Sequence, residues 1–153
     1  MRNTIIILII SLIAVSCGKD KFTTAPQIKY KSVNPDRIGS DLLSTDPHPS
    51  LTLHVTDLEG DIGVKDTSIS YLYVKHVGLN RIDSFPFPDI HSVTGRNFEA
   101  DIIFDLFYAL RPNPGNTTRP RTDTLFFEFY VKDFAKNKSN VVTNSNPFFY
   151  EIK

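Results

Sequence analysis

Three carboxylates fall within five residues of a short glycine-containing segment, Asp57-Leu58-Glu59-Gly60-Asp61-Ile62-Gly63. Carboxylate oxygens are the hard ligands that calcium prefers, and glycine lets the backbone bend so that such oxygens converge. Asp57, Glu59 and Asp61 are therefore candidate calcium ligands. The spacing is not that of an EF-hand, whose loop is longer and ends in a bidentate glutamate.

A second polar segment, residues 131–140, offers further oxygen ligands and also follows a strongly apolar stretch. Asp133 and Asn137 would join the same calcium site if the two loops lie at one end of the fold. The alternative is that these five side chains only form turns, because Asp, Asn and Gly are common turn residues. Three lysines around Asp133 would also weaken a cation site.

Cys17 is the only cysteine of the chain, and it stands where a short apolar segment ends. A basic residue, Arg2, precedes the apolar run 5–15, and small or short side chains occupy positions 14–16. These are the features of a secretory signal sequence. The run is shorter than the stretch of about 20 apolar residues that a membrane-spanning helix needs.

This segment resembles a bacterial lipoprotein signal peptide, with Ala14-Val15-Ser16-Cys17 as its lipobox. Ala14 stands where leucine is usual. The resemblance implies cleavage before Cys17, acyl chains such as palmitate on that residue, and the membrane as a partner through the lipid. It implies a place in the Gram-negative outer membrane, on either the surface or the periplasmic face. The alternative is an ordinary cleaved signal peptide in which Cys17 is incidental.

Charge and length narrow the function classes. Lys and Arg total 17, as do Asp and Glu, so there is no net charge to attract nucleic acid, and we expect none to bind. We expect a signal peptide over 1–16, a lipidated tether over 17–26 and a single domain over 27–153. With Cys17 acylated, that domain has no disulfide, so its stability depends on its core.

Alternating apolar and polar residues predict an all-β domain. The clearest strands are predicted over 51–56, 98–106 and 125–131, and weaker ones over 27–33, 68–77, 80–87, 140–143 and 148–152. The strand over 80–87 belongs at a sheet edge because of its prolines, and 34–49 is expected to be a long connection. We predict an immunoglobulin-like antiparallel β-sandwich of about seven strands, with a small β-barrel as the alternative.

Two loops are candidate binding surfaces. Phe85 and Phe87 lie in a proline-stiffened segment, which would present two rings with little loss of entropy. Arg111, Arg119 and Arg121 lie in a long loop that could contact an envelope protein or a glycan. The alternative is an edge strand followed by a connection without a binding role.

The order of these motifs is similar to that in small immunoglobulin-like lipoproteins of Gram-negative bacteria, most of them of unknown function. The resemblance covers roughly Leu51 to Ile152 and rests on Asp-x-x-Gly-Asp-Ile-Gly after a strand and a later Val-x-Asp-x-x-x-Asn turn. No catalytic motif is present, so we expect no enzyme. The prediction is a lipid-anchored, non-catalytic binding or adhesion module. The alternatives are an assembly component of an outer-membrane complex, packing through Phe126 and Tyr130, and a small hydrolase.

Overall fold

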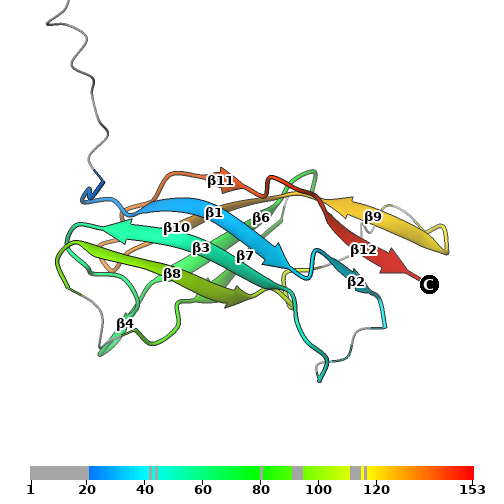
Figure 1. The fold of residues 1–153 in the computed structure, drawn as a ribbon, viewed down its shortest axis with the longest axis horizontal. Coiled ribbons are helices and arrows are strands. Elements are labelled where there is room, and N and C mark those ends of the chain that lie inside the picture. Colours follow the sequence, from blue (N-terminus) through cyan, green and yellow to red (C-terminus); the bar gives the residue numbers. More distant parts are fainter. Residues whose placement is uncertain are drawn as a thin grey trace, which may run out of the picture.

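Two antiparallel sheets pack face to face (Figure 1). The computed structural model describes residues 21–41, 43, 45–79, 81–90, 95–110, 115 and 117–153. The first sheet has three strands, in the order β1 (Gln27–Asn34), β3 (Ser50–Asp57) and β8 (Phe98–Asp105). The second sheet has four, in the order β11 (Val142–Thr143), β10 (Phe127–Lys132), β6 (Tyr71–His76) and β7 (Arg81–Pro86).

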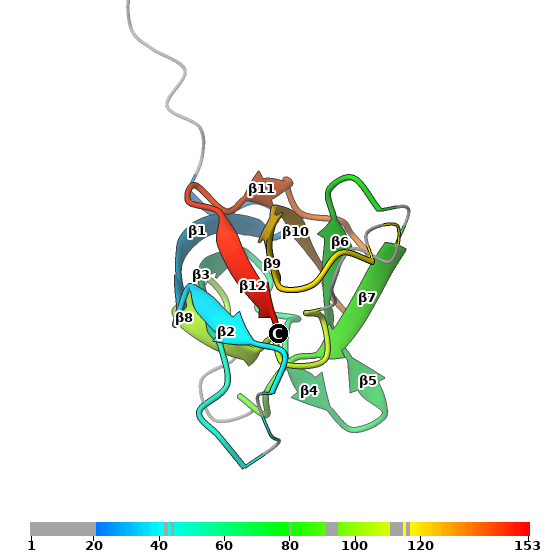
Figure 2. The same ribbon diagram turned by 90° about the vertical axis from the view of Figure 1, so that its right-hand side faces the viewer.

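Two smaller sheets extend this sandwich. Figure 2 shows one of them at the end nearest the C-terminus, with strand order β2 (Arg37–Gly39), β12 (Phe148–Ile152) and β9 (Arg121–Leu125). The other is a hairpin of β4 (Val64–Lys65) and β5 (Ser68–Ile69). β2 runs parallel to β12, whereas the other strand pairings of the described residues are antiparallel.

The predicted fold class is confirmed: the described residues form an all-β sandwich, and none of their sheets closes into a barrel. The two main sheets supply the predicted number of about seven strands, and β7 lies at a sheet edge as its prolines indicate. Within the described ranges, no helix is long and apolar enough to cross a membrane.

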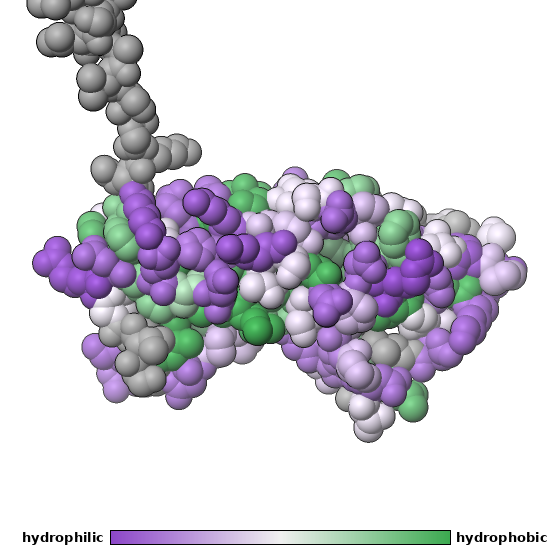
Figure 3. Space-filling model, in the orientation of Figure 1, coloured by the Kyte–Doolittle hydropathy of each residue, from purple (hydrophilic) through white to green (hydrophobic). Residues whose placement is uncertain are grey.

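The core lies between the two main sheets and comes from the predicted alternation. Leu51, Leu53 and Val55 of β3 have no exposed surface, and Phe127 and Phe129 of β10 face them from the other sheet with at most 1% exposed. Burying one such side chain stabilises the fold by about 1.5–3 kcal/mol. Polar and charged residues dominate the opposite face of the first sheet, where apolar patches are scattered (Figure 3).

Two segments differ from their predicted extent. The strand predicted over 125–131 belongs to a longer extended segment that changes sheets at Phe126, because β9 pairs with β12 whereas β10 pairs with β6 and β11. The predicted connection 34–49 contains β2. This strand has only three residues, too few to show an alternation of apolar and polar side chains in the sequence.

A side chain closes the free edge of β1. The Asn140 side chain accepts a hydrogen bond from the backbone N–H of Ile28 (2.8 Å) and donates one to the Ile28 carbonyl (2.9 Å). The Asn140 side-chain amide thus makes the two hydrogen bonds to Ile28 that the backbone of a neighbouring strand would otherwise make. Sheet edges with unpaired backbone groups are sites of unwanted strand addition, so this contact protects β1.

Candidate metal centre

The acidic segment begins where β3 ends and turns sharply at two glycines. Gly60 and Gly63 have positive φ angles of 69° and 116°, a region that L side chains rarely adopt. A Cβ atom at Gly60 would also lie against the backbone of Gly95, inside the 3.0 Å limit that real Cβ atoms keep. Position 60 therefore requires glycine for two reasons: its positive φ angle and the close approach of the Gly95 backbone.

The Asp57 carboxyl has no exposed surface, and its two oxygens have different environments. Oδ2 accepts hydrogen bonds from the backbone N–H groups of Gly60 (2.6 Å) and Asp61 (3.1 Å), as in an aspartate that stabilises a turn. Oδ1 is also buried but has no hydrogen-bond partner among the described residues. The turn therefore explains the hydrogen bonds of Oδ2 but leaves the buried Oδ1 without a partner among the described residues.

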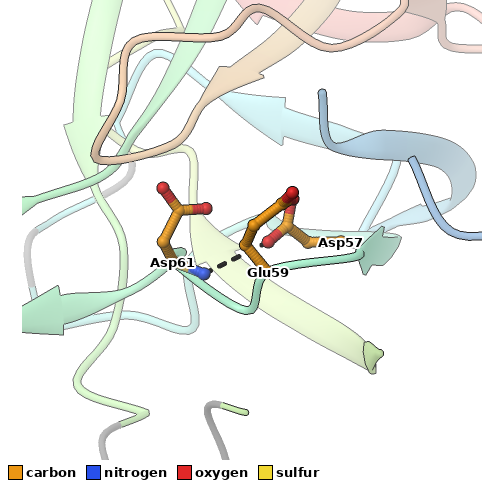
Figure 4. A group of neighbouring side chains, drawn as sticks. All are labelled: Asp57, Glu59 and Asp61. Atoms are coloured by element: carbon orange, nitrogen blue, oxygen red, sulfur yellow. Dashed lines mark hydrogen bonds between the residues drawn. The ribbon is translucent and has the colours of Figure 1, made fainter. Parts of the chain in front are cut away.

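Asp57, Glu59 and Asp61 come together as predicted. One carboxylate oxygen of each lies within 4.8 Å of the others, and Figure 4 shows the three carboxyl groups on the same side of the loop. Oδ1 of Asp61 is a second buried oxygen that has no partner in the described part of the chain. Glu59 is exposed, so the cluster extends from the core to the surface.

The loop after β10 contacts this cluster through Asp61, so both polar segments lie at one end of the sandwich. The Phe134 backbone N–H donates to the Asp61 carbonyl (2.9 Å), and Asp133 is fully buried. Asn137 donates to Asp133 from its backbone N–H (2.7 Å) and its side-chain amide (2.8 Å). Asn137 thus holds the Asp133 carboxylate in place through two donor groups, which are not cation ligands.

Two of the lysines expected to oppose a cation point elsewhere. The Nζ of Lys132 lies over the Tyr73 ring (5.3 Å to the ring centroid), and the Nζ of Lys138 lies over the Tyr130 ring (4.1 Å). Both rings belong to the outer face of the four-stranded sheet, where they stack on each other. These cation–π contacts draw both positive charges toward tyrosine rings.

Burial and mutual repulsion change how the cluster titrates. Burial, and to a smaller extent the Asp61 charge, raises the pKa of Asp57 to about 7, although the hydrogen bonds from Gly60 and Asp61 partly oppose the change. Burial and the charge of Asp133 likewise raise the pKa of Asp61. Without a cation, a proton on Asp57 or Asp61 is the way to relieve the repulsion, since it lets one carboxyl donate to the other.

The aromatic loop prediction needs correction. Phe87 is 3% exposed and its ring packs edge-on against Phe104 in the core, with centroids 5.0 Å apart. The Phe87 backbone N–H donates to the Ser70 carbonyl (3.0 Å), which pulls this segment inward. Phe85 is half-buried and packs on the same core. The Phe87 ring is therefore inaccessible to a partner, and only part of the Phe85 ring is exposed.

The structure describes two of the three candidate arginines, and neither Arg111 nor Cys17 lies within its described residues. Arg121 makes a two-pronged ion pair with Asp123 (2.9 and 3.2 Å) in which both side chains are about 10% exposed, so it supports the fold. Arg119 is exposed and donates to the Lys153 carbonyl (3.2 Å).

An aromatic cluster at the opposite end of the sandwich was not predicted as a unit. The Phe107 ring stacks on His48 (4.3 Å between centroids), and Tyr108 packs edge-on against Phe107 (5.1 Å) while remaining 61% exposed. His48 Nδ1 is 2.7 Å from the Asp105 carboxylate. No local pattern indicates this contact, because almost 60 residues separate His48 from its partners.

Comparisons with known proteins give no information on function. No family model matches the chain, and no curated protein or solved structure shows significant similarity to it.

Proposed function

We propose that this protein is a lipid-anchored envelope protein whose β-sandwich is a non-catalytic binding or adhesion module for an envelope protein or a glycan. The observation that carries the proposal is Tyr108, an exposed aromatic residue held in place by Phe107 and His48. Rings fixed in this way are typical contact residues for sugars and proteins, because binding them loses little conformational entropy.

The attachment of the N-terminal segment supports an outward orientation for Tyr108. The Leu58 backbone N–H donates to the Thr23 carbonyl (3.2 Å), and Lys21 pairs with Glu99 (2.6 Å), so this segment docks at the acidic end. Cys17 precedes Lys21 by four positions, so the two residues can be at most about 14 Å apart. Lipid on Cys17 would hold the acidic end near the bilayer.

The length of β3 separates the two ends. His48 precedes this eight-residue strand and Asp57 ends it, so the aromatic cluster lies roughly 25 Å from the acidic cluster. A domain tethered at the acidic end would therefore present Tyr108 away from the membrane, where a partner can reach it.

The anchor is tested by replacing Cys17 with Ser in the native host. We expect the wild-type chain in the membrane fraction, beginning at Cys17 and heavier by its acyl chains in intact mass spectrometry. The Cys17→Ser variant should lack that added mass and leave the membrane fraction, since several acyl chains are needed for lasting attachment. An unmodified wild-type chain recovered in soluble form would contradict the anchored part of the proposal.

The binding surface is tested by a photo-crosslinking amino acid placed at Tyr108 or, in a separate strain, at Tyr130. We expect a discrete covalent adduct from position 108, lost when Phe107→Ala removes the support of the ring. Position 130 samples the alternative of an assembly component, because Tyr130 stacks on Tyr73 (4.7 Å) on the outer sheet face near the exposed Phe126. An adduct from position 130 alone would favour that alternative.

A further inference from the structure

We propose that Asp57, Glu59 and Asp61 bind a calcium ion that locks the two acidic-end loops together, with Asp133 as a positioning residue behind them. The inference does not depend on where the protein is anchored or on what Tyr108 contacts. It rests on the geometry of the cluster and on two buried carboxylate oxygens that have no hydrogen-bond donor among the described residues when both groups are ionised.

The spacing of the oxygens matches a single ion. Calcium–oxygen bonds are about 2.3–2.6 Å, so two ligands on opposite sides of one ion are about 5 Å apart. The three carboxylates each offer an oxygen within 4.8 Å of the others. Calcium accepts six to eight oxygens, so water would complete the shell on the side of Glu59, which is exposed.

Two buried carboxylate oxygens without hydrogen-bond partners support the site independently of the clustering of acidic residues. Asp57 has no exposed surface, and its Oδ1 has no hydrogen-bond partner in the residues described. Oδ1 of Asp61 is buried without one as well. Buried polar atoms in native proteins nearly always have partners, because an unpaired atom loses its hydration without compensation. A cation between these two atoms would satisfy both at once.

The surroundings select the kind of ion. The three ligands are hard carboxylate oxygens, and neither histidine nor cysteine belongs to this cluster, which disfavours zinc and softer metals. Magnesium demands near-ideal octahedral geometry and keeps several of its waters, which a buried carboxylate such as Asp57 fits poorly. Calcium tolerates irregular loops of this kind. The affinity expected for three carboxylates is that of extracellular calcium modules, with Kd of about 0.1–1 mM.

The ion would connect the two loops through contacts already present. Asp61 is the shared residue: its carboxylate belongs to the cluster, and its carbonyl accepts from the Phe134 backbone N–H. Asp133 adds a buried negative charge next to Asp61 and is itself oriented by Asn137. Leu58 binds the N-terminal segment at Thr23, so the same ion would make the tether attachment more rigid.

The test measures thermal unfolding and calorimetric binding of the full chain, purified in detergent and freed of metal. A ligand that binds only the folded state raises its stability, so calcium at about one hundred times Kd should raise the Tm by about 5–10 °C. Magnesium at the same concentration should raise it far less. Failure of calcium to bind at 10 mM, or an equal response to magnesium, would overturn the proposal.

Three variants separate the site from general charge effects. Glu59→Gln changes an exposed side chain, so the fold should persist while the calcium shift falls to less than half. Asp57→Asn should abolish the shift. Asp66→Asn is the matched control, since Asp66 is an exposed acid in the nearby β4–β5 turn and asparagine tolerates its φ of 53°. A calcium shift that survived both site variants, or that vanished in the control, would contradict the assignment.

Discussion

Replacing Gly60 with Ala should destabilise the domain by about 3–5 kcal/mol, against about 1–2 kcal/mol for Gly78→Ala. Both glycines have positive φ angles, 69° and 88°, so an alanine strains the backbone similarly at each. They differ in their surroundings: a Cβ at Gly78 meets nothing within 4 Å, whereas one at Gly60 collides with the Gly95 backbone. The difference between the variants therefore isolates that close approach.

Chemical denaturation of the two variants and the wild type gives this difference directly. Gly60→Ala should also weaken calcium binding, because the Gly60 N–H that orients Asp57 would have to move. Gly78 lies in the turn between β6 and β7, and its variant should bind calcium as the wild type does. Equal losses of stability in the two variants would mean that the acidic loop can shift away from Gly95 at no cost.

Calcium-free protein should lose stability as the pH rises from about 4 to about 7. The pKa of Asp57 is raised to about 7 in the folded state from an ordinary value of 3.8, chiefly by burial. Between these values the folded state binds more protons than the unfolded state, so the free energy of unfolding falls with increasing pH. The loss amounts to a few kcal/mol and is complete above the folded pKa. Asp61, whose pKa is also raised, changes stability in the same direction.

Urea denaturation at pH values between 5 and 8 measures this slope, and Asp57→Asn should flatten most of it because asparagine does not titrate. Other groups facing the cluster, Glu59 and Asp133, are present in both proteins. Saturating calcium should oppose the loss at high pH, because the ion binds the ionised carboxylates and competes with protons. An unchanged slope in Asp57→Asn would show that another group causes the pH dependence.

The sandwich was predictable because each long strand buries one face. Alternation in 51–56, 98–106 and 125–131 requires only that one side of a strand meet a core, and the structure buries the predicted side in each case. The short strands were not predictable in the same way. β2 has three residues and owes its position to parallel pairing with β12, more than one hundred residues later.

The site was predictable in its residue types but not in its burial. The acidic segment has the composition of an exposed turn, and nothing local indicates that Asp57 is fully covered. The loop after β10, about 75 residues further along the chain, joins this site through the Phe134–Asp61 hydrogen bond, which no local pattern predicts. Phe87 is the opposite case, since its flanking prolines suggested an exposed loop whereas contacts with Ser70 and Phe104 place it in the core.

The bonds between Asn140 and Ile28 have a consequence for the order of folding. They join the first strand of the sandwich to a residue 112 positions later, and β2 likewise waits for β12 at the end of the chain. Contacts of such high sequence separation form slowly and only when both partners are present. The free edge of β1 at Ile28 and the pairing of β2 are therefore completed only after Asn140 and β12 have joined the fold.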